Sequence, residues 1–340
     1  MSKKTFAVWD IGATKCAAAI VHYDVNTDRL DCVARCRIKL KDCQSLDELL
    51  ERVESELQFK TANADAICIA AAGRYNGKYI ELEKGYPYPM DFGRIAKLHQ
   101  WTNFAIVHDY VPVACATFTK YVTEPGNAII LNKGKVVPFS RRVVFGIGTG
   151  LGLKDIVHLP NGDFWLGSNE AGHIGLPFPP TAKKEHQQRH QEFIKFLRSD
   201  GLKEDDPIVF ETILSGKGLS RTYHFITGET EATPEEISES IHAGNHPEVL
   251  KMMSYYLGLF IGTIQLTFMP RGGIWFTGGV VLKNMSLCDQ SDMFEGIHAS
   301  PAYEHVRKDF PLSVMCGPDY AFLGCAYYAK KRMLSALYAE

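Results

Sequence analysis

The segments 6-FAVWDIGATKCAAAIV-21 and 142-RVVFGIGTGLGLKDIV-157 follow one pattern, and this pattern decides the fold. Each has an apolar run of strand-forming residues, a short turn of Gly, Ala or Thr, and a second apolar run, which predicts a β-hairpin. Small residues at such a turn let backbone N–H groups approach an anion, because little Cβ bulk stands in the way. Two such turns in one chain predict two loops that close on a polyphosphate.

The composition is that of a soluble globular protein with more than one core. The chain has 340 residues, 46% hydrophobic and 22% charged, which favours two domains. A formal net charge of −2 provides no basic field for nucleic acid. The N-terminus does not resemble a signal peptide, and the apolar stretch 255–269 is shorter than a bilayer span. We therefore expect a cytoplasmic protein without membrane or nucleic-acid partners.

The nine cysteines are scattered and form no CxxC pair, so we expect free thiols in a reducing compartment.

Strand and helix patterns alternate along the chain, as in α/β folds. We expect further strands at 30–38, 65–72, 104–107 and 273–276, and helices from Ser45, at about 111–121, through most of 207–269, and from Ala321 onward. The first helix has capping-box spacing at its start and places Leu46, Leu49, Leu50, Val53 and Leu57 near one face. The polar segment 177–190 predicts a surface excursion.

The common nucleotide motifs are missing from the sequence. The segment 215-SGKG-218 lacks the first Gly and the final Ser or Thr of a P-loop. The glycines at 146–152 do not have the spacing of GxGxxG, which disfavours a dinucleotide fold and a dehydrogenase. One Gly-rich hairpin is often only a tight turn. The pair of hairpins, together with Gly278 and Gly279 after a strand, favours a nucleotide site.

Asp109 is the candidate catalytic residue. It follows an apolar strand directly, at a position where a carboxylate points into a crevice rather than a core. There it could accept a proton from a substrate hydroxyl. The alternative is that Asp109 caps the N-terminus of the following helix, which is a common use of Asp.

Glu170 and His173 lie in the polar turn 167-GSNEAGHIG-175. The same Glu-x-x-His spacing recurs at 239–242 and 295–298. A di-metal site would need this spacing on paired helices of a four-helix bundle, which the sequence does not indicate. Hydrogen bonding to a polyol suits the pair better, because Glu accepts and His can donate.

Six motifs in order resemble those of the bacterial-type glucokinases, ATP:glucose phosphotransferases of the actin-like sugar-kinase superfamily. The motifs are DIGAT at 10–14, HD at 108–109, GIGTGLG at 146–152, EAGH at 170–173, ETILSGKGL at 211–219 and GGIWFTGGV at 272–280. They resemble the family's DxGGT, ND, GTGLG, EGGH, E-x-x-LSGxGL and GGVYxxGGI. The cysteine cluster of the related ROK kinases is missing, so the resemblance is to the non-ROK branch.

The resemblance implies a role for each matching residue. Asp109 would be the general base on the sugar 6-hydroxyl. The sugar would be bound by His108, Asp109, Glu170, His173 and Glu211. ATP would be bound by Asp10, Gly12, Ala13, Thr14, Lys15, Gly148, Thr149, Gly150, Gly278 and Gly279. Asp10 would lie near Mg²⁺, through water. Phosphoryl transfer by these residues would depend mainly on in-line positioning and on charge stabilisation.

Four positions depart from the family pattern. His108 stands where the family has the Asn that touches glucose, and Lys15 stands for another Asn. Ala13 replaces the second Gly of DxGGT, at a cost of about 1 kcal/mol if that position needs a positive φ. Glu83 and Lys84 stand where the family has Thr-Asn near the sugar.

The sequence and the resemblance together imply an α/β protein with two lobes of the actin-like ATPase (ribonuclease H-like) type. Each lobe would be a mixed sheet flanked by helices, with a cleft between the lobes. The expected domains are 1–109 with 321–340, and 110–320. The expected function is ATP-dependent phosphorylation of D-glucose by a cytoplasmic homodimer that uses Mg²⁺. The alternatives are a kinase for another hexose and a sugar-binding regulator of the same fold.

Overall fold

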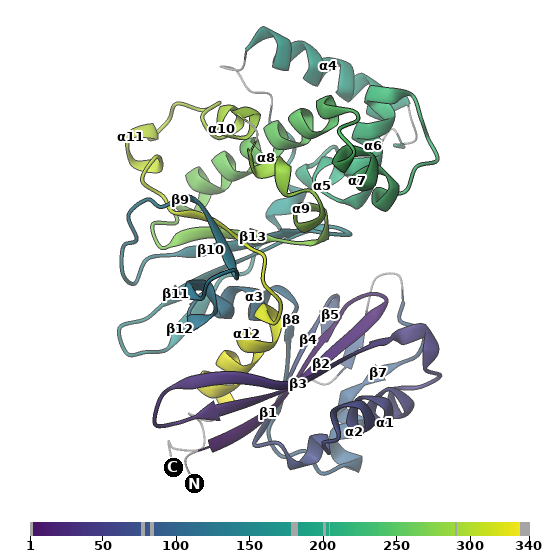
Figure 1. The fold of residues 1–340 in the computed structure, drawn as a ribbon, viewed down its shortest axis with the longest axis vertical. Helices are drawn as coiled ribbons and strands as arrows, with labels where there is room; N and C mark the ends of the chain where they lie inside the picture. Colours follow the sequence, from purple (N-terminus) through teal and green to yellow (C-terminus); the bar gives the residue numbers. More distant parts are fainter. Residues whose placement is uncertain are drawn as a thin grey trace. The chain divides into compact units, whose positions relative to one another are not determined.

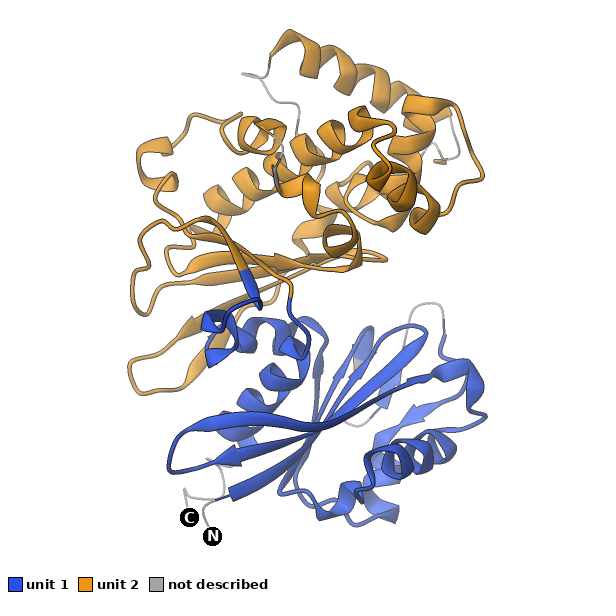
Figure 2. Ribbon diagram, in the orientation of Figure 1, with its two compact units in different colours: residues 1–128, 317–340 blue, residues 129–316 orange. Residues whose placement is uncertain are grey.

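The computed structural model describes residues 3–75, 79–81, 85–177, 183–199, 202–203, 205–289 and 291–333. The chain divides into two compact units, residues 1–128 with 317–340 and residues 129–316 (Figure 2). The sequence placed the first division after Asp109. In the structure, α3 (Tyr110–Ala116) packs against α12 (Tyr320–Tyr328), so the first unit continues beyond that position.

Unit 1 contains a five-stranded mixed sheet in the order β3-β2-β1-β4-β8 (Figure 1). Its strands are β1 (Lys3–Ile11), β2 (Lys15–Asp24), β3 (Arg29–Lys39), β4 (Ala66–Ala71) and β8 (Phe104–His108). Strands β1, β2 and β3 are antiparallel neighbours, whereas β1, β4 and β8 run parallel. The first predicted hairpin is therefore confirmed, and three strands bring their carboxyl ends to one edge of the sheet.

Helices cover both faces of this sheet. One face packs on α1 (Leu46–Leu57) and α2 (Phe92–Leu98), and the other on α12 and α3. Ser45 caps α1 by accepting a hydrogen bond from the Glu48 N–H at 3.2 Å, and all five predicted leucine and valine positions of α1 are buried. Unit 1 also has a small sheet of β5 (Arg74–Tyr75), β6 (Tyr79–Glu81) and β7 (Met90–Asp91).

Unit 2 contains a six-stranded mixed sheet in the order β12-β11-β10-β13-β14-β9. Its strands are β9 (Ala128–Asn132), β10 (Arg142–Ile147), β11 (Leu151–His158), β12 (Phe164–Leu166), β13 (Gly273–Thr277) and β14 (Leu312–Met315). Strands β10 and β11 form the second predicted hairpin, and β10, β13 and β14 run parallel. This arrangement repeats the hairpin and parallel strands of unit 1.

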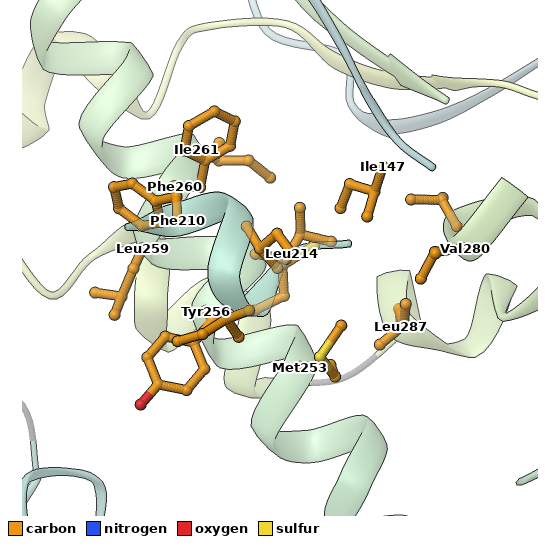
Figure 3. Packing of buried hydrophobic residues seen from close by; sticks show 14 of the residues in the cluster. Ile147, Phe210, Leu214, Met253, Tyr256, Leu259, Phe260, Ile261, Val280 and Leu287 are labelled. Atoms are coloured by element: carbon orange, nitrogen blue, oxygen red, sulfur yellow. The ribbon is translucent and has the colours of Figure 1, made fainter. Parts of the chain in front are cut away.

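The helices of unit 2 pack around α8, which is buried along most of its length. They are α4 (Lys184–Ser199), α5 (Phe210–Ile213), α6 (Gly216–Thr227), α7 (Pro234–His242), α8 (Pro247–Phe268), α9 (Gly279–Lys283), α10 (Ser291–Ile297) and α11 (Glu304–Arg307). Figure 3 shows Phe260 and Phe210 side by side in this core, with ring centroids 4.9 Å apart. Helix α8 is long and apolar enough to cross a membrane, but 83% of its most apolar window is buried inside the protein, as in a core helix.

The predicted helix at 111–121 is shorter in the structure. Helix α3 ends at Ala116, and Lys120–Thr123 form a separate 3₁₀ turn. The hydroxyls of Thr117 and Thr119 donate to the carbonyls of Ala114 and Ala116 at 2.7 and 2.8 Å. These side-chain hydrogen bonds compete with helical continuation. The predicted C-terminal helix likewise runs as α12 only to Tyr328 and then widens into a π-helical turn at Ala329–Met333.

Most of 183–190 is exposed or partly exposed, as expected for a surface segment, but 184–190 form the first part of α4, which was not predicted; residues 178–182 lie outside the described part of the chain. His186 and His190 are buried in this helix. The His186 ring stacks on Tyr255 with centroids 4.0 Å apart and lies 2.9 Å from a Glu295 oxygen. Partners on α8 and α10 thus satisfy side chains that look polar and exposed in the sequence.

Close packing of α8 on α10 predicts that Gly258→Ala destabilises the protein. A Cβ at Gly258 would lie 1.9 Å from the Met293 carbonyl oxygen. Overpacking of this kind costs about 1–3 kcal/mol, although Ala favours a helix over Gly. We expect a lower urea midpoint than for wild type. The control is Thr267→Ala on the exposed side of the same helix, and equal midpoints for the two variants would contradict the packing argument.

Candidate active site

The carboxyl edge of the unit 1 sheet brings two acidic residues together. In the ladders, Asp10 on β1 is the partner of Ala70 on β4, and Ala71 on β4 is the partner of His108 on β8. The Asp109 N–H then donates to the Ala71 carbonyl at 3.1 Å. Because the three strands are parallel, Asp10 and Asp109 lie at the same sheet edge, where ligands of α/β proteins usually bind.

Asp10 has a perturbed carboxyl group. Its pKa is raised from 3.8 to about 6, first by burial and second by the charge of Asp109, while Arg37 acts in the opposite direction. Between these two pH values the folded chain retains a proton that the unfolded chain releases, so stability falls as pH rises through this interval. Ionised Asp10 therefore destabilises the fold at neutral pH. Such a perturbed group at a sheet edge is a candidate functional residue.

The structure does not support the capping alternative for Asp109. The residue occupies the N-cap position of α3, but its side chain makes no cap hydrogen bond. Its Oδ1 is buried. His108 Nδ1 lies 2.9 Å from this oxygen and 3.4 Å from the Tyr110 nitrogen. The tautomer of His108 decides which of these two contacts is a hydrogen bond, and in neither case does the Asp109 side chain cap α3.

The first hairpin turn is open to solvent. Its Gly12 N–H donates to the Lys15 carbonyl at 3.0 Å, and Ala13, Thr14 and Lys15 are exposed. Ala13 does not have a positive φ, so the cost considered for the Gly-to-Ala departure does not arise. A Cβ at Gly12 would meet only the Lys15 carbonyl, at an ordinary 3.8 Å. The protein itself leaves room above this turn.

Two residues near the carboxylates escaped the sequence analysis. Arg37 on β3 is the ladder partner of Ala17, which is in turn the partner of Asp10, so all three share one face. Tyr86 donates its hydroxyl to the Ala72 carbonyl at 2.8 Å. Burial raises the pKa of Tyr86, and the charges of Asp109 and Asp10 raise it further. Neither residue lies in a recognisable motif. Glu83 and Lys84 lie outside the described residues.

In unit 2 the Glu211 side chain accepts a hydrogen bond from the second hairpin turn. The Leu151 N–H donates to Glu211 Oε2 at 2.8 Å, and a Cβ at Gly150 would lie 2.7 Å from this oxygen. The Gly216 N–H at the start of α6 donates to the Gly148 carbonyl at 2.8 Å. One oxygen of Glu211 thus fixes the turn, a role that the sequence analysis did not assign to it.

Three of the residues predicted for sugar binding, Glu170, His173 and Glu211, are neighbours in unit 2. Glu170 and His173 are exposed on a 3₁₀ turn at Ala171–His173. A Cβ at Gly172 in this turn would lie 2.4 Å from the Leu151 carbonyl, so the turn rests on the second hairpin. The Phe210 N–H donates to the Ile174 carbonyl at 3.1 Å, which brings the neighbouring Glu211 to the same place.

A hollow of about 520 Å³ opens beside the second hairpin turn. It is lined by Gly148, Thr149, Gly216, Lys217, Leu219, Pro234, Glu235, Ser238, Gly279, Val280 and Lys283. Gly278, next to it, has φ +106, and a Cβ there would lie 2.3 Å from the Ile147 carbonyl. The predicted nucleotide residues 148, 149 and 279 therefore line one hollow. Its α6 and α7 residues were not predicted.

The candidate residues thus form two sets, one in each unit. Asp10, the 12–15 turn, His108 and Asp109 belong to unit 1. The 148–150 turn, Glu170, His173, Glu211 and Gly278-Gly279 belong to unit 2.

Comparison with known proteins assigns the chain to a family. Residues 8–332 match the family model described as Glucokinase. A glucokinase from Mesorhizobium japonicum is 25% identical over 339 residues, which cover 96% of this chain and 92% of the relative. The match spans all six motifs of the sequence analysis.

Solved structures share the fold. A glucokinase from an Antarctic psychrotroph superposes with a TM-score of 0.79 at 18% identity, over 96% of this chain and 98% of the other. A ROK family glucokinase from Streptomyces griseus, crystallised with glucose and AMPPNP, superposes with a TM-score of 0.53 at 15% identity, over 97% and 99%. Both α/β units thus have the fold of the actin-like sugar kinases, and the chain belongs to the glucokinase family of hexose kinases.

Proposed function

We propose that this protein transfers the terminal phosphoryl group of ATP to the 6-hydroxyl of D-glucose. The single observation that carries the proposal is the Asp109 carboxylate, which does not cap its own helix and lies at the same sheet edge as Asp10. A carboxylate that the helix does not use can accept a hydrogen bond from a substrate hydroxyl.

Asp109 acts as the general base in this proposal. The glucose O6–H donates to Oδ1, the proton moves to Asp109 as the oxygen attacks phosphorus, and the bond to the ADP oxygen breaks. A positioned base contributes about 10²–10⁴-fold. Holding hydroxyl and phosphate in line contributes more, on the order of 7–11 kcal/mol. Glu170, His173 and Glu211 would supply this positioning by hydrogen bonds to the ring hydroxyls.

The two hairpin turns and the unit 2 hollow would bind ATP. A Cβ at Gly148 meets no atom within 4 Å, and the space at Gly12 is similarly open. Thr149, Gly150, Lys15 and the 12–14 turn would contact phosphates through backbone N–H groups and side chains. Gly278 and Gly279 would flank the adenosine.

Asp10 and Asp109 fit a divalent cation that arrives with the phosphates. Mg²⁺ typically takes one or two carboxylates plus phosphate oxygens and water, and Asp10 and Asp109 at one sheet edge would supply such ligands. Among the described residues no three His, Cys, Asp or Glu gather into a metal cluster, so the chain offers no all-protein cage. Asp10 would hold the ion through water, and the ion would neutralise phosphate charge.

Further parts of the proposal concern the branch, the assembly and the location. The cysteine cluster of the ROK kinases is missing from the sequence, which supports a place in the non-ROK branch. The family resemblance supports a homodimer, and the free cysteines support a cytoplasmic protein. The two-unit division at 128/129 and 316/317 supports a two-domain kinase. His108 favours one alternative, a preference for another hexose.

Replacement of the base tests the reaction. Asp109→Asn should lower kcat about 10²–10⁴-fold while hexose binding is retained, because the amide cannot take the proton. ADP release is measured over a panel of glucose, mannose, fructose and glucosamine. The matched control is Asp91→Asn, since Asp91 does cap its helix by accepting from the Arg94 N–H at 2.9 Å.

Two results of this assay would contradict parts of the proposal. Full glucose turnover by Asp109→Asn would remove Asp109 as the base. Hexose binding by wild type with no ADP release from any hexose would favour the sugar-binding regulator.

His108→Asn restores the amide that the family resemblance implies for glucose. One added hydrogen bond of about 1 kcal/mol should lower KM for glucose about fivefold, with a smaller effect on other hexoses. The measurement is KM and kcat for each hexose, with the exposed His99→Asn as control. A raised KM for glucose in His108→Asn would show that the histidine itself is the better sugar contact.

A further inference from the structure

A second hollow, of about 630 Å³, lies in unit 1 beside the first hairpin turn. It is lined by Ala13, Thr14, Lys15, Lys39, Leu40, Lys41, Gly85, Tyr86 and Pro87. Three of these side chains are lysines. The sequence analysis assigned only Lys15, as part of the phosphate turn, and the reaction described above uses neither Lys39 nor Lys41.

The backbone holds the lysines in place. Lys15 and Lys39 are direct partners in the β2–β3 ladder. The Leu40 N–H donates to the Thr14 carbonyl at 2.9 Å, which ties the segment after β3 to the hairpin turn. Lys41 follows in the 3₁₀ turn Leu40–Asp42.

Charge balance at this hollow is unfavourable in the chain alone. Like charges directly opposite each other on neighbouring strands are destabilising, and the Lys15–Lys39 pair is of this kind. Within the described ranges no carboxylate pairs with Lys15, Lys39 or Lys41. An anion from outside the chain would relieve the repulsion.

The hollow is next to the candidate carboxylates. Tyr86, in its wall, donates its hydroxyl to the Ala72 carbonyl at 2.8 Å, and the Asp109 N–H donates to the neighbouring Ala71 carbonyl. Thr14 and Lys15 belong both to the hollow and to the turn proposed for the transferred phosphate. An anion bound here would therefore lie at the proposed site of phosphoryl transfer.

We propose that Lys39 and Lys41, together with Lys15, form a phosphate subsite in unit 1. The subsite binds a phosphomonoester dianion or the terminal group of a polyphosphate. Within the proposed kinase reaction, on which this inference rests, the group is either the terminal phosphate of ATP or the phosphate of glucose 6-phosphate. Lys39 and Lys41 would hold it electrostatically rather than take part in the chemistry.

The test uses the double variant Lys39→Gln/Lys41→Gln in the full-length protein. Calorimetric titration with inorganic tripolyphosphate, which requires no turnover, should give a dissociation constant at least about tenfold above wild type, because two charge-assisted contacts are lost. The wild-type constant should also depend more steeply on salt. The control is Lys97→Gln, an exposed lysine on α2 outside the hollow. Thermal melting checks that each variant folds.

Kinetics separate the two sources of the phosphate. A raised KM for ATP in the double variant with an unchanged inhibition constant for glucose 6-phosphate assigns the subsite to the donor, and the reverse assigns it to the product. Wild-type affinity for tripolyphosphate in a folded double variant, or an equal loss in Lys97→Gln, would overturn the subsite. Absence of glucose phosphorylation by wild type would instead contradict the proposed reaction, and the titration would still decide the subsite.

Discussion

The unit 1 site depends on the burial of Asp10 beside a second acidic residue, Asp109, at one sheet edge. Parallel pairing of β1, β4 and β8 fixes both residues there, and the fold bears the cost of a carboxyl whose pKa is raised to about 6. Arg37 reduces this cost without removing it. A buried carboxyl beside a second acid suits a cation and a hydroxyl proton, which would lower this cost when they bind.

The β10–β11 hairpin of unit 2 resembles the β1–β2 hairpin of unit 1, but other contacts support its turn. Its 148–150 turn is fixed by Glu211 and by the start of α6, and opens towards a hollow whose lining combines glycines with Lys217, Glu235 and Lys283. The unit 1 turn has few such supports and is surrounded by lysines. Lysine side chains thus line the hollow beside each turn. A phosphoryl-transfer enzyme needs such charges together with positioning, because these two effects supply most of its rate.

Much of the fold was predictable from local patterns. Both hairpins and the apolar face of α1 follow from alternation, turn residues and helical spacing, which act over a few residues. Helix α4 was not predicted, because its polar sequence favours an exposed segment. His186 and His190 are buried only through contacts with Tyr255 and Tyr256 of α8 and Glu295 of α10. Asp109 was placed correctly at the end of a strand. That its side chain does not cap the following helix can be seen only in the tertiary structure. Arg37 and Lys39 join the site through strand register, and Tyr86 joins it through its hydrogen bond to the Ala72 carbonyl; no short motif encodes either.

The most direct test is a carboxyl ¹³C NMR titration of Asp10 in the wild-type protein and in Asp109→Asn, with Asp10→Asn for assignment. The account predicts a pKa of about 6 for Asp10 in wild type and a lower value, still above 3.8, in Asp109→Asn, because the repulsion is removed while the burial remains. An ordinary pKa in wild type, or one that is unchanged by loss of Asp109, would contradict it.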